Sequence, residues 1–458
     1  VNPDFGQVDA DPAEVNLTAF ETFFPERRPF FTEGNRLLTG TGPGYFYSRR
    51  IGDAPRGTSA KDFVDGPDNT TIIGAAKVTG RTSKGLSVGA LAAVTSRESA
   101  ETYDVPNNHY GRVRIAPLSG FAATHLQQEF GRSSSTFGLS LTGMERDVPE
   151  GDPLSQIYSR RAYTGGVDWN LRFKGGAYAL SGYAGFSYVG GDSIRMADVQ
   201  AASARYYQRP DIDYVKYDPS RTSLEGYTAG LGFSKAAGRH WLYDAFASTE
   251  SPGFELNDVG RLSTADDIDV DANIRYRETR PRGLLHRWSV GLFNHLNWNY
   301  GLQRQFTRFA TSASLTWKNY QQTFLGLYVL PGTQSDDLTR GGPLMASPTA
   351  WGVDYSLHSN EAGNVQVGVN GNLEWTEFEG NSASIGASLS IRPGPRWYFS
   401  IAPRYERGTN TRQYVDTQGG GTAATYGQRY IFSSLDQTTI SAQVRLTYAL
   451  TSDLTFEG

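Results

Sequence analysis

The stretch YTGGVDWNLRFK, residues 163–174, decides the fold because its side chains separate into two chemically different sets. Every second position from Tyr163 to Phe173 is aromatic, aliphatic or glycine, whereas the positions between them, apart from Gly166, are polar. A period of two is typical of a β-strand whose two faces meet different surroundings. Strands of soluble sheets average about five or six residues, so a stretch of this length favours a tilted strand that crosses a membrane.

The same alternation recurs along the chain, at 365–376, 383–392 and 439–450. The mean hydropathy is only −0.46, and no run approaches the roughly 20 apolar residues that a spanning helix needs. A barrel strand shows apolar side chains on one face alone, so a low mean hydropathy is compatible with it. We therefore expect an all-β fold, a large antiparallel transmembrane β-barrel.

Turn signals divide the alternating stretches into hairpins. The expected pairs are 72–80 with 86–95, 121–130 with 135–146, 162–173 with 177–189, 227–235 with 239–248, 268–278 with 284–298, 305–317 with 321–330, 349–358 with 364–375, 382–391 with 396–406, and 428–434 with 438–449. This gives eighteen strands, and another begins at Asp453-Leu454-Thr455-Phe456. Because bacterial barrels close with even strand numbers, we expect the parent protein to continue past Gly458, with at least about twenty strands.

The links between these hairpins are long at 96–120, 190–226, 249–267, 331–348 and 407–427, whereas the turns inside them are short. Long loops on one side and short turns on the other are typical of the extracellular and periplasmic ends of outer-membrane barrels.

Composition excludes several function classes. Lys and Arg number 43 against 47 Asp and Glu, so nothing indicates a nucleic-acid partner. The chain has no Cys, which excludes disulfides and thiolate metal sites. None of the six His residues form a helical metal pair, and no phosphate-binding loop is present, so we expect no cofactor.

Residues 1–70 lack the alternation, and we treat them as an irregular N-terminal segment before a barrel at 71–458. We predict that this segment plugs the lumen or lies at its periplasmic mouth; the alternative is a plain linker. Four Phe residues favour the plug, because a free linker has no need of them. The candidate plug residues are Phe23, Phe24, Pro25, Arg27, Arg28, Phe30 and Phe31. Arg49 and Arg50 could contact an anionic ligand, although a structural ion pair is the commoner arrangement.

The polar set of the alternating stretches predicts which side chains face the lumen. They are Asp168, Asn170, Arg172, Asn370, Asn372, Glu374, Arg392 and Arg445. A hydrolytic site at the outer rim would need a base beside a nucleophile, and His295 shares its face with Ser289, Asn297 and Asn299. The sequence does not predict which of these side chains lie close together in space.

Acidic residues gather in the long links and could hold Ca²⁺ through oxygen ligands. None matches a calcium loop, and solvated loop charge is the commoner explanation. They are Asp211, Asp213 and Asp218, then Glu255 and Asp258, then Asp266, Asp267 and Asp269.

Several motifs resemble a known family. They are NPDFGQV (2–8), FETFFPERRPFFTEG (20–34), FYSRRIG (46–52), IGAAKVTG (73–80), YTGGVDW (163–169), YQRPD (207–211) and SPGFELND (251–258). These stretches resemble bacterial outer-membrane proteins in which a family 9 carbohydrate-binding-like module precedes a large barrel domain of unknown function. The resemblance implies that the module lies before Val1, and that any contact with carbohydrate belongs to it. It implies no reaction and no catalytic residue.

The sequence therefore predicts an outer-membrane channel or uptake or export component of Gram-negative bacteria, embedded in outer-membrane lipid. That its solutes are carbohydrate-related is implied by the family resemblance alone. Two alternatives remain open: a surface anchor for a carbohydrate-binding module and partner proteins, and a barrel hydrolase with an active site at its rim. Val1 begins in mid-motif, and we take it as a cut or processed end.

Overall fold

A computed structural model describes residues 15–378, 380–451 and 454–457. In this part of the chain, 18 strands belong to one antiparallel sheet, and two small sheets accompany it. The 18 strands are β2 (Ile72–Arg81), β3 (Leu86–Thr95), β6 (Ser119–Phe130), β7 (Ser135–Arg146), β8 (Arg161–Phe173), β9 (Tyr178–Gly190), β10 (Ser223–Lys235), β11 (Trp241–Glu250), β12 (Asp267–Glu278), β13 (Leu285–Trp298), β14 (Arg304–Trp317), β15 (Gln322–Leu330), β18 (Ala350–His358), β19 (Val365–Thr376), β20 (Asn381–Gly394), β21 (Trp397–Gly419), β22 (Gln428–Ala449) and β23 (Thr455–Glu457). The predicted all-β class is confirmed.

Helices are few and short. They are α1 (Pro29–Thr32), α2 (Ser193–Ala201) and the 3-10 turns η2 (Asn35–Leu37), η3 (Ser48–Arg50), η4 (Pro153–Gln156) and η5 (Ala423–Thr425). No helix in the described ranges has the length and apolarity that crossing a bilayer requires.

The chain divides into two compact units. Unit 1 takes the chain up to Phe233, with Ala247–Ile268 and Asn299–Gly301, and unit 2 takes Ser234–Phe246, Asp269–Trp298 and the chain from Leu302 onward.

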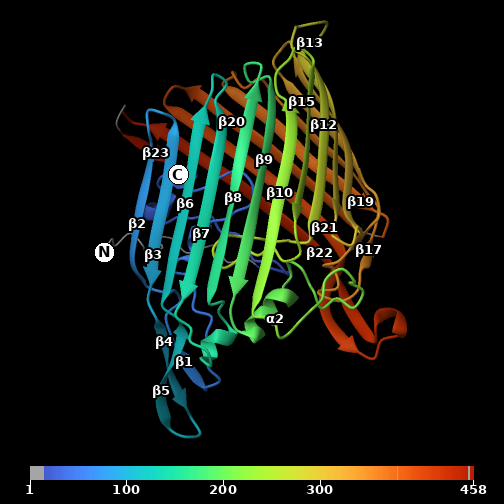
Figure 1. Ribbon diagram of the computed structural model, residues 1–458. Coiled ribbons are helices and arrows are strands. Elements are labelled where there is room, and N and C mark those ends of the chain that lie inside the picture. The colour runs from blue at the N-terminus through green and yellow to red at the C-terminus, as the bar shows by residue number, and fades with distance from the viewer. Residues whose placement is uncertain (1–14, 379, 452–453, 458) are drawn as a thin grey trace. The chain divides into compact units, whose positions relative to one another are not determined.

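In unit 1, β2, β3, β6, β7, β8 and β9 pair in that order, each antiparallel to the next. A three-stranded sheet of β1 (Phe63–Asp65), β4 (Glu98–Asp104) and β5 (His109–Ala116) lies at one end of these strands, as does α2 (Figure 1). We call this end the loop end. The expected loop 96–120 therefore contains a hairpin, and 190–226 contains a helix.

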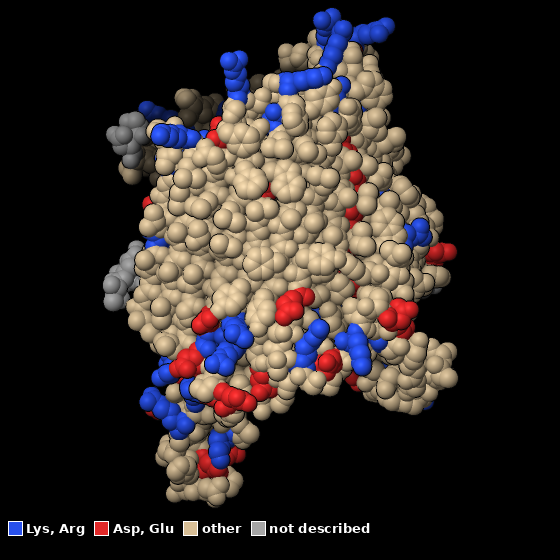
Figure 2. All heavy atoms as spheres, viewed as in Figure 1, with Lys and Arg blue, Asp and Glu red and all other residues tan. Residues whose placement is uncertain are grey.

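The two faces of the unit 1 strands differ. One, which we call the bare face, carries exposed apolar side chains such as Leu139 and Leu141. Figure 2 shows almost no charged atoms over the middle of these strands, and charges gathered around the loop end. The opposite side, which carries Asp168 and which we call the covered face, is packed against the N-terminal segment.

Toward the loop end, the covered face is apolar and buried. Leu91, Phe121, Met144 and Val189 pack there against the segment, α2 and the link after β11. The segment contributes Phe31, Leu38 and Ile51, α2 contributes Met196 and Val199, and the link contributes Val259. We expected the side chains on the lumen side of each strand to be polar. This expectation is wrong at the loop end, because other parts of the protein cover these strands there.

In unit 2, β13, β14, β15, β18, β19, β20, β21, β22 and β23 pair in order. A two-stranded hairpin of β16 (Thr333–Ser335) and β17 (Met345–Ser347) lies within the link 331–348. We call the side carrying His295 and Asp354 the polar face, and the side carrying Leu292 and Leu327 the apolar face.

One part of the hairpin prediction is wrong. The expected strands 428–434 and 438–449 form one strand, β22, and the expected loop 407–427 is largely the continuation of β21. Asp436 and Gln437, taken for a turn, pair with Thr409 and Gly408, and the chain reverses between Gly419 and Gln428. With β22 undivided, β23 is the eighteenth strand of the sheet; Asp453, where we expected it to begin, lies outside the described residues.

Candidate functional site

Residues 15–51 lie across the covered face of unit 1, and glycines make room for them. A Cβ atom at Gly89 on β3 would overlap the backbone of Leu37, and one at Gly34 would lie 2.9 Å from the Thr79 hydroxyl on β2. Thr79 and Gly89 are register partners close to the β2–β3 turn, at the end opposite the loop end. The segment therefore runs far along these strands.

Tyr45 makes the closest approach. Its hydroxyl lies over Gly166 on β8 and Gly185 on β9, which are register partners, and a Cβ atom at either would collide with it. Burial raises the pKa of the Tyr45 phenol, and the neighbouring Tyr183 and Asp168 raise it further. Tyr45 is therefore neutral and fixed between two strands. Lys77 of β2 donates to the carbonyl oxygens of Phe30 and Glu33, which fixes the other arm of the segment.

Gly40 covers three polar side chains. A Cβ atom there would lie 2.9 Å from Asp168 Oδ2, 3.0 Å from Ser140 Oγ and 3.1 Å from His125 Nε2. His125 Nδ1 is 3.3 Å from the carbonyl oxygen of Leu37. These are residue types that hydrolases use, but all three are buried beneath the segment.

The segment is also held by its own ion pairs. Glu26 accepts hydrogen bonds from Arg28 at 2.7 and 2.9 Å and from Ser48 at 2.6 Å. Arg28 donates in addition to the carbonyl oxygen of Ile51 at 2.8 Å and lies over the Phe31 ring. Burial alone would raise the pKa of Glu26, but the hydrogen bonds and the charge of Arg28 outweigh it and hold that pKa below its usual value.

Both ends of the segment are fixed at the loop end. Arg50 donates to Glu21 at 2.7 and 2.9 Å and to the carbonyl oxygen of Gly260 at 3.0 Å. Tyr47 N donates to the carbonyl oxygen of Val259 at 3.0 Å. The segment therefore enters and leaves at one end, as a loop folded onto the sheet, and Arg50 forms the structural ion pair that its sequence context favoured.

The link after β11 is held by buried ion pairs. Arg205 donates to Glu255 at 2.5 Å, and Arg146 donates to Asp258 at 2.5 Å. Burial opposes the Asp258 charge, but Arg146 and Arg195 outweigh it and hold the pKa of Asp258 far below its usual value. The prediction that these two acids are solvated loop charges is wrong, because each has an arginine from another element as its partner.

The other acidic residues form no metal centre. Asp266 accepts hydrogen bonds from the Tyr214 hydroxyl at 2.5 Å and from Tyr300 N at 3.0 Å, and Asp218 accepts from Ser220. Across residues 15–378, 380–451 and 454–457, no three His or acidic side chains are grouped so that they could hold a metal ion.

The candidate plug residues have different surroundings. Phe31 and Arg28 are buried, Phe24 and Phe30 are half-buried, and Phe23, Pro25 and Arg27 are exposed. Phe23 lies under Arg261 at 4.7 Å, and the carbonyl oxygens of Phe24 and Pro25 accept from Tyr47 and Arg49. Only Phe31 of the four Phe residues enters the core.

The side chains expected to face a lumen lie in both units. In unit 1, Asp168 is buried under Gly40, Asn170 is half-buried and Arg172 is exposed. In unit 2, Asn372 donates to Asp354 at 2.7 Å, and Glu374 accepts from Tyr328 at 2.8 Å. Asn370 is half-buried, Arg392 is exposed beside Tyr398, and Arg445 is exposed.

His295 lies among carboxylates. Its Nδ1 is 2.9 Å from Asp271, and its Nε2 is 3.6 Å from Asp269. Both ring nitrogens thus meet acids, and this arrangement orients an imidazole without supplying a nucleophile. His295 borders a hollow of about 380 Å³ on the polar face, and its register partner Arg308 also lines this hollow, as does Asp354.

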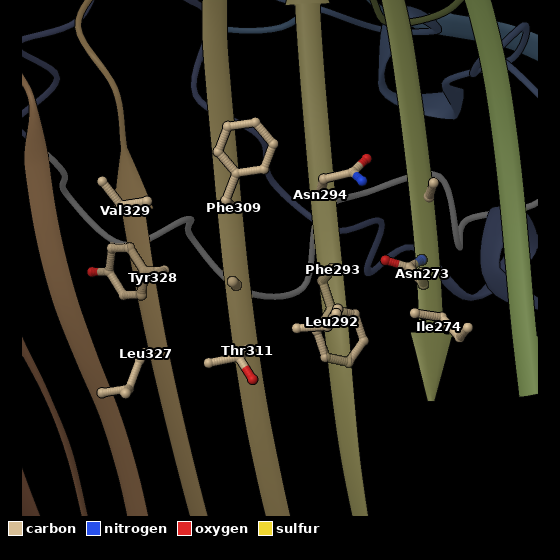
Figure 3. Close-up of a pocket in the computed structure, with 12 residues that line it drawn as sticks. Asn273, Ile274, Leu292, Phe293, Asn294, Phe309, Thr311, Leu327, Tyr328 and Val329 are labelled. Atoms are coloured by element: carbon tan, nitrogen blue, oxygen red, sulfur yellow. The ribbon is translucent and has the colours of Figure 1, made fainter. Parts of the chain in front are cut away.

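A second hollow, of about 680 Å³, crosses β12 to β15 (Figure 3). Leu292, Thr311 and Leu327 are register partners and share the apolar face there, together with Phe309 and Val329. Apolar side chains dominate the lining, so the hollow suits a hydrocarbon chain rather than a polar solute.

A single family model covers almost the entire sequence. The family model for DUF5916, a domain of unknown function, matches residues 1–457. The chain belongs to the DUF5916 family. No curated protein matches its sequence.

Solved structures resemble this DUF5916 chain only distantly. An anion-selective porin from Comamonas acidovorans is 9% identical with a TM-score of 0.32, over 84% of this chain and 100% of that one. The siderophore receptor PirA from Acinetobacter baumannii is 8% identical with a TM-score of 0.40, over 82% of this chain and 64% of the receptor. At these values they carry no argument about what the DUF5916 chain transports or binds.

Proposed function

We propose that this chain forms the membrane-spanning part of a bacterial outer-membrane channel or uptake or export component, with residues 15–51 as its plug. The observation that supports the membrane assignment is an exposed apolar face on strands of nine or more residues. Ile440 is 79% exposed, Leu292 59% and Val367 50%. Transfer of such side chains from water to hydrocarbon contributes about 25 cal/mol per Å², so lipid is the surrounding that stabilises them.

The plug is supported by the fit between the segment and the sheet. Gly89, Gly166 and Gly185 stand on three strands at the points where the segment approaches most closely. A linker that only passed by would need no such room. The segment places Phe31, Leu38 and Ile51 in the core of unit 1, which holds it at the loop end.

Carbohydrate-related solutes are part of the proposal on the strength of the family resemblance alone. The surface-anchor alternative differs from the channel in one measurable respect: an anchor needs no solute flux.

The test uses the absence of native cysteine. A Cβ atom at Gly34 would lie 3.2 Å from the Thr79 Cβ, near the roughly 3.5–4.5 Å that a disulfide requires. In planar bilayers, the oxidised G34C/T79C variant is expected to conduct less than its reduced form. The single variant G34C is the control, because it carries the same backbone strain without a tether.

Two outcomes contradict the proposal separately. Equal conductance of the oxidised and reduced double variant, with the disulfide confirmed by mass, excludes a displaceable plug. A folded protein that conducts in none of its forms, and passes no solute in liposomes, excludes the channel and favours the anchor.

A further inference from the structure

The polar face of unit 2 has a hollow near the β12–β13 turn. Its volume is about 360 Å³, and side chains of β12, β13, β14, β15 and β18 line it. Three of the lining residues are arginines, Arg275 and Arg277 on β12 and Arg287 on β13. Hydroxyl groups border the same space, those of Ser289, Ser314 and Ser356 among them.

The alignment of β12 with β13 places the three arginines near one another along the two strands. Asp269 contacts Asn297, and Asp271 contacts His295, so β12 and β13 run antiparallel in a fixed alignment. Continuing this alignment along both strands places Arg277 opposite Ser289 and leaves Arg287 one diagonal step away. Diagonal neighbours on one face of a sheet are about 7–8 Å apart, within reach of arginine side chains.

The nearby acids are engaged elsewhere. Asp271 contacts His295, and Asp354 accepts from Asn372 with Arg308 at 3.6 Å. Glu278, which itself lines the hollow, accepts from Arg280 N and lies 3.7 Å from His240. Within the described residues, no carboxylate lies within ion-pair distance of Arg275, Arg277 or Arg287.

The contacts that these arginines do make leave most of their donors unused. Arg287 donates from Nε to Thr316 Oγ1 at 3.1 Å, and Arg277 donates from Nη2 to the carbonyl oxygen of Gly238 at 2.7 Å. The Nε of Arg277 is buried and has no hydrogen-bond partner among the described residues. Arg275 lies 5.7 Å from the Phe293 ring. Arg277 is half-buried, whereas Arg275 and Arg287 are exposed. A purely structural role for Arg277 would pair its charge, because half-buried charges are ordinarily compensated.

We propose that this hollow binds a small oxyanion, a phosphate or carboxylate group of a solute. Guanidinium groups present paired N–H donors that match both groups, and Ser and Thr hydroxyls can donate to the remaining oxygens. The lining holds three arginines against the one carboxylate of Glu278, and this excess of positive charge also raises the local concentration of anions. The site adds to the proposed channel function the charge of the solute. The inference rests on that function, because the solute reaches the hollow through the channel.

The test measures binding and conduction on the same folded, full chain. Inorganic phosphate is titrated into the protein in neutral detergent micelles by calorimetry, and the reversal potential is recorded in bilayers under a KCl gradient. The variant R275Q/R277Q/R287Q is expected to bind phosphate at least about tenfold more weakly, since each lost charged hydrogen bond contributes roughly a tenfold factor or more. The parent chain is expected to prefer chloride over potassium, and the triple variant is expected to lose that preference.

The control variant is R407Q. Arg407 is a register partner of Ala383 on the other face and pairs with Asp436 at 2.9 Å, so its loss should leave phosphate binding and selectivity unchanged. Single variants R275Q and R287Q, each with a several-fold weaker effect, serve if the triple variant does not fold.

The outcomes separate this site from the channel. Conduction without anion preference, together with phosphate binding that the triple variant retains, overturns the anion site and leaves the channel. Phosphate binding that depends on these arginines, in a protein that conducts nothing, supports the site and overturns the channel.

Discussion

Gly166 and Gly185 show how single residues adapt the sheet to the segment. They face each other on β8 and β9, and the Tyr45 hydroxyl occupies the space that two Cβ atoms would fill. In a strand, glycine lowers stability, and it is found where a backbone or a ligand must approach closely. The sequence shows these glycines but not their partner, because the segment lies more than a hundred residues earlier in the chain.

Substitution of Gly185 by Ala should loosen the segment. The new methyl group collides with the Tyr45 hydroxyl, and overpacking of this kind costs about 1–3 kcal/mol. Trypsin should then cleave sooner after the exposed Arg36, and the conductance in bilayers should rise. Gly80→Ala is the matched control, because no atom lies within 4 Å of a Cβ there. Unchanged proteolysis in G185A would show that Tyr45 does not fix the segment.

Acid should weaken the link after β11 through Asp258. Its pKa is held far below the usual value in the folded state, so the stability that it contributes is present above the unfolded pKa of about 3.9 and is lost as the pH falls below that value. Removing the charge leaves Arg146 buried and unpaired, which costs about 3–5 kcal/mol. Asp258→Asn should therefore lower the free energy of unfolding at pH 7 and flatten its decline in acid.

Urea unfolding in detergent micelles between pH 3 and 7, followed by tryptophan fluorescence, measures both effects. Asp436→Asn removes an exposed partner of Arg407 and should have a much smaller effect. An acid decline as steep in D258N as in the parent chain would show that another group titrates.

At the scale of elements, periodicity predicted the long strands, because the two faces of each alternating run meet different surroundings. It failed at β22, where Asp436 and Gln437 resemble turn residues but pair with Thr409 and Gly408. It also gave no sign of the apolar core at the loop end. There, Leu91 and Ala93 continue the inward set of β3, and the run from Gly89 to Val94 is apolar on both faces. Such a run indicates apolar surroundings on both faces, which was the available signal; Val94, on the bare face, is itself exposed.

The β21–β22 hairpin predicts where an insertion is tolerated. An epitope placed between Gly420 and Gly421 lies in the loop that joins the strands, and it should leave the folded mobility on unheated gels unchanged. The same epitope between Asp436 and Gln437 interrupts a continuous ladder and should abolish that mobility. If the protein tolerated the epitope equally at both points, the result would support two separate strands with a turn at Asp436 and Gln437, as the sequence predicted.

At the scale of the whole molecule, the sequence could not predict that the link after β11, α2 and the N-terminal segment contact one another. Their contacts are ion pairs and backbone hydrogen bonds between distant residues, as in Arg50 with Gly260 or Arg205 with Glu255. Two of the motifs that carry the family resemblance, FYSRRIG and SPGFELND, meet in this way, because Arg50 of the first donates to Asn257 of the second at 3.4 Å. Their contact in unit 1 gives a physical reason for motifs so far apart in the chain.

The apolar face supplies the most general prediction, since it tests the surroundings of the entire sheet. Ile385 on β20 is 48% exposed, and the adjacent Ser384 borders a hollow of about 670 Å³ beside Glu406. In lipid vesicles, Ile385→Arg should lower the free energy of unfolding by about 2–4 kcal/mol, as for a charge on the lipid side of a barrel near the midplane. Ser384→Arg, one residue away, meets water and a carboxylate and should change it little. If instead I385R left the protein as stable as the parent chain, and soluble without detergent, these apolar side chains would have to be covered by protein rather than by lipid.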